Sequence, residues 1–247
     1  MYPESIRQER TDTMLRTLTL AFTLLAAPFF GSEAAAQSTT VYGGIKTNYA
    51  FVDFGFTQYD RTVAQGGITH TWSNDIYADV WGSRALDGNE FGDEIDVTLG
   101  WRGDCGNISC HVALSAFDIP TPVVGDFDLT GNDIIRLRLE ISDSYPVSET
   151  DAIGWYASAD QLTGFIETNL WRAGTNWTHQ LNANWSTSAK IGAAYNADPD
   201  TFSAHWELGI NRAVDNWTIG ATVGGYESPT VGEGHPVTWG VNFSRTF

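Results

Sequence analysis

Charged side chains recur at every second position in several apolar segments of the chain. Arg136, Arg138 and Glu140 alternate with isoleucine and leucine, and the segment that begins at Glu94 repeats the pattern. Successive side chains of a β-strand point to opposite faces, so each segment predicts a strand with one apolar and one polar face. The polar faces carry nearly balanced charge, which suits the lining of a water-filled interior. The predicted lining residues are Glu94, Asp96, Arg102, Arg136, Arg138, Glu140, Lys190 and Glu207.

Short motifs of common enzyme active sites are missing from the sequence. There is no Gly-x-Ser-x-Gly elbow, no His-Glu-x-x-His motif, no phosphate-binding loop and no dinucleotide fingerprint. His205 and Glu207 could act as an acid–base pair, although ordinary polar lining residues are the simpler interpretation. Residues 87–92 resemble the start of a calcium loop, but Phe91 and Thr98 occupy positions that need ligands. We therefore predict no catalytic residue, no metal site and no cofactor.

Two cysteines, Cys105 and Cys110, flank a short turn. Residues that face each other on antiparallel strands have Cα atoms about 4.5 to 5.5 Å apart, within reach of a disulfide. Because an exported chain meets oxidising conditions, we predict a structural disulfide. A reactive thiol pair or a metal site is the alternative, but no second cysteine pair exists to complete a zinc site.

The N-terminal region has the pattern of a secretory signal. Arg16 precedes an apolar run over 18–30, and the alanines at 34–36 offer a small-residue cleavage site. The run is short for a helix that spans a bilayer. We interpret 1–36 as a signal peptide, with Met14 as an alternative start, and 37–247 as a single domain. A buried N-terminal helix is the other interpretation.

After removal of residues 1–36 the chain has 10 Lys and Arg against 26 Asp and Glu, a net charge of −16. Nucleic acid is an unsuitable partner for such a chain, because phosphate binding needs a basic surface. No later segment approaches the roughly 18 to 20 apolar residues of a membrane helix. The 25 glycines and 10 tryptophans agree with a membrane β-barrel, but a secreted β-sandwich could share this composition.

Turn residues divide the chain into an even number of candidate strands. A tilted strand needs about 9 to 11 residues to cross a membrane, so a barrel of this many strands fits the length of the mature chain. We predict an all-β fold, an antiparallel transmembrane β-barrel of twelve strands, with a soluble sandwich as the alternative. The predicted strands are 41–58, 66–73, 76–84, 94–103, 108–117, 133–143, 152–159, 163–174, 184–195, 202–212, 216–226 and 236–247.

Turn lengths and aromatic residues predict the orientation of this barrel. Short turns follow even-numbered strands and longer acidic loops follow odd-numbered ones, so both termini should be periplasmic. Asparagine–tryptophan pairs at Trp177, Trp185 and Trp217 are interpreted as turn residues followed by membrane anchors. The last strand alternates strictly and ends at Phe247, which resembles the closing strand that the barrel assembly machinery recognises in bacterial outer-membrane proteins.

The chain also resembles the TorF-like family of small outer-membrane porins. The resemblance rests on the segments 65–73, 76–83, 94–103 and 243–247, and it covers most of the mature chain. One departure is Phe54, where an arginine would be expected before Gly55. The resemblance implies a passive channel in the outer membrane of a Gram-negative bacterium.

These observations support three functional hypotheses. The first is a porin-like channel for small hydrophilic solutes, weakly cation-preferring because its loops are acidic, with outer-membrane lipids and the assembly machinery as partners. The second is a barrel hydrolase, which the missing nucleophile motif disfavours. The third is a closed barrel with a structural or adhesive role.

Overall fold

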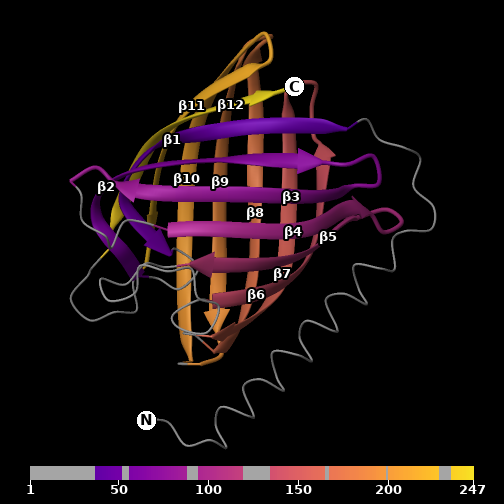
Figure 1. The fold of residues 1–247 in the computed structure, drawn as a ribbon. Helices are drawn as coiled ribbons and strands as arrows, with labels where there is room; N and C mark the ends of the chain where they lie inside the picture. The colour runs from indigo at the N-terminus through magenta and orange to yellow at the C-terminus, as the bar shows by residue number, and fades with distance from the viewer. Residues whose placement is uncertain are drawn as a thin grey trace, which may run out of the picture.

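The alternating segments form one antiparallel sheet that closes on itself. The computed structural model describes residues 37–51, 56–87, 94–118, 134–164, 167–198, 200–227 and 235–247. Within these ranges every strand pairs with its sequence neighbours, and β1 pairs with β12 (Figure 1). The twelve strands are β1 (Ser38–Phe51), β2 (Phe56–Thr71), β3 (Ile76–Ala85), β4 (Glu94–Asp104), β5 (Ser109–Asp118), β6 (Ile134–Pro146), β7 (Asp151–Gly164), β8 (Thr168–Asn182), β9 (Trp185–Asn196), β10 (Thr201–Val214), β11 (Trp217–Tyr226) and β12 (Val237–Thr246).

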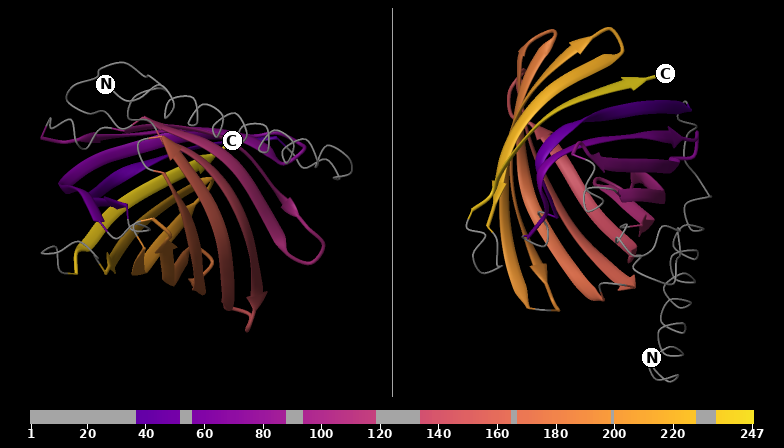
Figure 2. Two further views of the ribbon diagram at one scale, coloured as in Figure 1. Left: turned by 90° about the horizontal axis from the view of Figure 1, so that it is seen from below. Right: turned by 60° about the vertical axis from the view of Figure 1, so that its left-hand side comes forward.

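Pairing of the first and last strands completes the barrel and confirms the predicted fold class. The backbone N–H of Phe247 donates to the carbonyl oxygen of Thr39 at 2.9 Å, so the two ends of the described barrel lie side by side. Both views in Figure 2 show β1 beside β12. Because the sheet closes, β1 and β12 are not free edges where they pair, from Thr40 to Lys46 of β1.

The strands wind steeply around the barrel. In Figure 1, β1 to β5 run roughly horizontally, while β8 to β11 behind them run nearly vertically. Strands must tilt in this way for a sheet to close.

The longest connections, after β3, β5 and β11, lie at the end opposite the termini as the turn lengths predicted, but the connections after β7 and β9 at that end are short. Those at the end that carries the termini are short, and Asp75 and Asp215 adopt left-handed backbone conformations there, with φ of 64° and 54°. Aspartate is one of the residues that tolerate this region. The short turns cover 72–75, 105–108, 147–150, 183–184 and 215–216.

The structure corrects some predicted strand boundaries. The segment predicted as a single strand over 41–58 contains most of β1 (41–51) and the start of β2 (56–58). The strands predicted over 152–159 and 163–174 are β7 and β8, which run to Gly164 and Asn182. The prediction ends a strand at 159 because Asp160 and Gln161 are polar, whereas these residues continue β7. The predicted signal peptide (1–36, with Met14), Phe54 and residues 88–92 of the calcium-like segment 87–92 lie outside the described residues.

Polarity is inverted relative to a water-soluble protein. Along β10 to β12 the outward side chains are apolar and about half exposed, including Leu208 (51%), Ile219 (52%) and Trp239 (53%). The opposite face of the wall buries polar residues such as Glu94 and Ser115. We call this second face the interior face. In the described part of the chain, no helix has the length and apolar character needed to cross a membrane.

Candidate channel interior

The register of the sheet places all eight predicted lining residues on the interior face. Lys190 faces Glu207 across β9 and β10, and Glu140 of β6 faces His111 of β5. The other predicted residues alternate with outward side chains on β4 and β6. On these four strands the predicted inward and outward faces are those of the structure. A register error of one residue would have exchanged them.

A cavity of ≈ 430 Å³ brings four of these residues together. Arg138, Glu140, Lys190 and Glu207 border it, together with Lys46 of β1, which lies far from them in sequence. The ammonium group of Lys190 lies 5.0 Å from the centre of the Tyr156 ring, a cation–π contact that holds it to the wall. Charges of both signs therefore surround one polar space.

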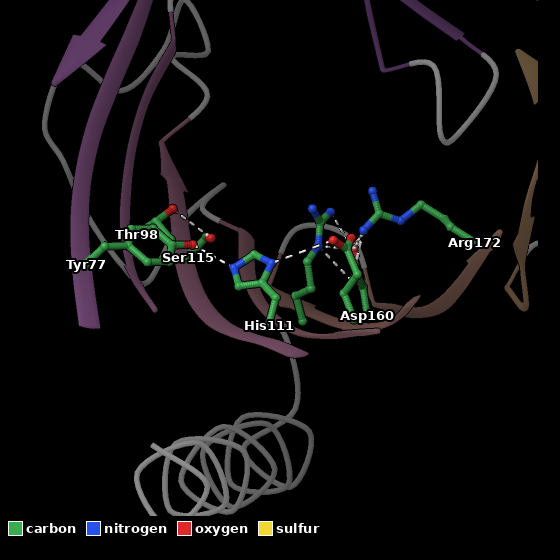
Figure 3. A network of polar contacts seen from close by, with 8 residues as sticks. Tyr77, Thr98, His111, Ser115, Asp160 and Arg172 are labelled. Carbon is green, nitrogen blue, oxygen red and sulfur yellow. Dashed lines mark hydrogen bonds and ion pairs between the residues drawn. The ribbon is translucent and has the colours of Figure 1, made fainter. Parts of the chain in front are cut away.

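Beside this cavity, one carboxylate binds two guanidinium groups. Nε of Arg138 donates to Oδ1 of Asp160 at 3.1 Å, and one terminal nitrogen donates to Oδ2 at 3.0 Å. A terminal nitrogen of Arg172 lies 3.1 Å from the same Oδ2 (Figure 3). The Asp160 side chain is fully buried, and the two guanidinium groups compensate its negative charge. Charge-assisted contacts of this kind are the stronger hydrogen bonds of proteins.

A second polar network connects β3, β5 and β6 across the wall. The hydroxyl of Tyr77 is hydrogen-bonded to Nε2 of His111 at 2.8 Å, and Nδ1 of His111 lies 4.0 Å from a carboxylate oxygen of Glu140. The guanidinium carbon of Arg102 lies 4.7 Å from the centre of the Tyr77 ring. Figure 3 shows Tyr77 and His111 approaching each other, with Asp160 and Arg172 farther along the wall. These contacts orient side chains at the surface of the interior.

Acidic residues gather on the interior face of β3 and β4. Asp79 accepts hydrogen bonds from the hydroxyl of Tyr42 at 2.9 and 3.0 Å, and Glu94 and Asp96 follow on β4. Arg136 packs over the ring of Phe117 at 4.5 Å. The described interior face thus has a group of acidic residues on β3 and β4 and residues of both charges around the cavity.

An apolar cluster narrows the loop end of the interior. It comes from five neighbouring strands, and each member faces inward by register. Its residues are Phe117, Ile134, Leu162, Leu170 and Ala194.

The side chains of Tyr156 and His205 lie close to Gly192 on β9. A Cβ atom added there would lie 2.5 Å from the Tyr156 hydroxyl and 2.6 Å from Nε2 of His205. Both distances are shorter than a van der Waals contact, so this position accepts only glycine without rearrangement. His205 and Glu207 share the interior face of β10, and the pair was considered as an acid–base candidate from sequence. Among the described residues no group of three His, Cys, Asp or Glu side chains is arranged to hold a metal ion.

Interior residues that the sequence did not reveal are Lys46, Asp79, Asp160 and Arg172. Asp160 was not among the predicted lining residues because the predicted strand ended at 159. The period of two along β7, extended beyond that point, would have put Asp160 on the interior face. Its two arginine partners lie on separate strands, and sequence alone does not show that proximity.

The cysteines lie at the short-turn end of the barrel. Cys105 and Cys110 form a disulfide with a Cα–Cα distance of 5.8 Å. Cys110 does not face Cys105 in the ladder, as the sequence argument assumed, but faces Gly103. The bond therefore joins the turn to the first residues of β5.

Aromatic residues lie at the same end of the barrel on β8, β9 and β11 and after β12. Trp185 and Trp217 begin β9 and β11 directly after short turns, as predicted, whereas Trp177 lies within β8 and does not follow a turn. Trp177 donates its indole N–H to Asp151 at 3.0 Å. The guanidinium carbon of Arg245 lies 5.2 Å from the Trp217 ring and 4.6 Å from the Phe247 ring. Such aromatic and basic pairs are typical of a membrane–water interface.

A closed, even-stranded antiparallel barrel with an apolar exterior and a polar interior is the fold of outer-membrane β-barrels. No protein-family model matches the chain, and no curated protein matches it either. Solved structures do share its fold. The KdgM porin has a TM-score of 0.55 and 9% identity, and the match covers 84% of this chain and 99% of that chain.

Two further structures agree. The COG4313 outer membrane channel from Pseudomonas putida F1 has a TM-score of 0.53 and 12% identity, covering 88% of this chain and 97% of that chain. The NanC porin has a TM-score of 0.52 and 8% identity, covering 84% and 98%. At such low identity these similarities establish the barrel architecture alone.

Proposed function

We propose that the protein is a channel for passive diffusion of small hydrophilic solutes across the outer membrane of a Gram-negative bacterium. The observation that carries the proposal is the cavity of ≈ 430 Å³ inside a closed barrel, bordered by Lys46, Lys190, Glu140 and Glu207. Ionised side chains are costly to bury without water or partners, so a polar cavity of this kind favours hydration. Three structures with the same fold carry the name porin or channel.

The charge distribution supports transport rather than a packed plug. Salt bridges join neighbouring strands, such as Arg138 to Asp160, and run along the wall. The charges of both signs around the cavity, and the acidic residues on β3 and β4, then act on a solute from several sides. A hydroxyl-rich solute can replace water at both sides through hydrogen bonds. The TorF-like assignment belongs to this proposal and rests on the sequence resemblance.

Orientation and partners follow from the same proposal. The end with the termini and short turns would face the periplasm, and the long loops would face outward. The exterior face would contact outer-membrane lipids. The barrel assembly machinery would recognise the last strand, which ends at Phe247. The acidic loops would attract cations to the outer mouth, which gives a weak cation preference at low salt.

Conductance recording tests the proposal directly. Purified protein in a planar lipid bilayer should produce discrete current steps, and liposomes that contain it should swell with small neutral sugars but not with large ones. Changing Lys46 and Lys190 together to glutamine should lower the relative permeability of anions. Arg212, which contacts Trp185 on the exterior, provides the matched control. Electrical silence together with no sugar uptake would refute the channel.

A closed barrel with a structural role is the second candidate. The apolar cluster around Phe117 and Leu170 favours it, because these side chains occupy interior space at the loop end. A folded barrel that neither conducts nor takes up sugar would support this candidate.

A further inference from the structure

We propose that Asp160 sets the charge selectivity of the channel, acting as a positioning residue for two arginines that border the interior. This inference rests on the proposed channel function and goes beyond it by assigning a role to a buried residue. The assignment starts from the position of Asp160 in the sheet. It lies on β7 directly opposite Arg138 of β6, and Arg172 of β8 approaches from the other side.

One carboxylate oxygen of Asp160 contacts two guanidinium groups. Terminal nitrogens of Arg138 and Arg172 lie 3.0 and 3.1 Å from Oδ2 of Asp160. The two nitrogens can therefore be no more than about 6 Å apart, a separation at which two positive charges repel unless a counter-charge lies between them. Asp160 supplies that counter-charge and holds both guanidinium groups, and Figure 3 shows Arg172 beside it.

Burial distinguishes Asp160 from the other acids near the cavity. Its side chain is 0% exposed, whereas those of Arg138 and Arg172 are 16% and 8% exposed. A passing solute meets the edges of the arginines and never the carboxylate. Glu140 and Glu207, by contrast, border the cavity themselves. Asp160 therefore acts on the solute only through the charge and position of its partners.

The net charge of the cluster gives the direction of the effect. Two arginines and one carboxylate leave one positive charge, and loss of the carboxylate leaves two. Both arginines border the cavity, so its positive charge would rise and anions would be enriched there. A unit charge a few ångströms from an aqueous path changes the local concentration of a small ion by about fivefold.

Bi-ionic reversal potentials of the full chain in planar bilayers test the inference. We expect Asp160→Asn to raise the ratio of chloride to potassium permeability by at least about fivefold. Arg172→Gln should lower that ratio, and the double variant should return to within about twofold of wild type because the charges compensate. Asp215→Asn is the matched control, since Asp215 lies in a short turn with a φ of 54° that asparagine also tolerates.

The outcomes separate the inference from the channel itself. A wild-type protein that conducts while Asp160→Asn keeps wild-type selectivity would overturn the role of Asp160. The same conclusion follows if Asp160→Asn and Arg172→Gln shift the ratio in the same direction, because general damage to the wall would do that. Should Asp160→Asn fail to fold, as judged by gel mobility without heating, unchanged selectivity of Arg172→Gln would refute the inference. Silence of the wild type would refute the channel and this role with it.

Discussion

Replacing Leu208 with arginine tests which face of the wall meets lipid. Leu208 lies near the middle of β10, and its outward side chain is 51% exposed. An arginine on the lipid face costs about 2 to 4 kcal/mol at the bilayer midplane and about 0 to 1 kcal/mol near the interfaces. In water the same exchange at a half-exposed position would stay within about 0.5 kcal/mol. The expected loss is thus roughly 30-fold to several hundredfold in the folding equilibrium constant.

Equilibrium unfolding in phospholipid vesicles measures this cost. Val214→Arg is the matched control, because Val214 is an outward residue on the same strand at the short-turn end. We expect Leu208→Arg to lower the free energy of unfolding by about 1 to 4 kcal/mol beyond Val214→Arg. Equal effects of the two variants, or a neutral Leu208→Arg, would show that this face does not lie in hydrocarbon and would remove the basis for the channel.

Three further predictions concern the disulfide, the crowded glycine and the C-terminus. Changing Cys105 and Cys110 to serine should cost no more than about 2 kcal/mol in urea unfolding, because the closed loop is short, and a larger loss would contradict this account. Gly192→Leu should destabilise the barrel by about 1 to 3 kcal/mol in the same assay, while Ala193→Leu on the exterior should be tolerated; equal stability of both would argue against the packing. Phe247→Ala should lower the amount of folded barrel in cell membranes several-fold without slowing refolding of purified protein into vesicles, and unchanged assembly in cells would refute its role as a signal.

The barrel could be predicted from sequence because its faces repeat with the shortest possible period. A strand needs only a few alternating residues to define its two faces, and the segments at 94–103 and 133–143 each supply enough. Antiparallel neighbours then follow from short turns, so each strand pairs with the next one. This is why all eight predicted lining residues share one face, even though they are spread over four strands.

The interior networks could not be predicted because they join strands through side chains. Asp160 and Gln161 are polar, and aspartate is common in turns, so the predicted strand ends at 159 and is too short. In the barrel, two arginines on neighbouring strands compensate the charge of Asp160 and allow the strand to continue. Trp177 was misplaced for a related reason, since its asparagine neighbour lies in a strand and does not form a turn.

Two separate sources of ion preference are expected in such a channel, and salt distinguishes them. The strands contain 10 basic and 11 acidic residues, so most of the net charge of −16 in residues 37–247 lies in the connections between strands. Charges on loops act through water over a Debye length of about 10 Å at 0.1 M salt and about 3 Å at 1 M. A cation preference of the mouth should therefore fade as salt rises. The preference set by Asp160 and its arginines should persist, because buried or partly buried charges are screened much less.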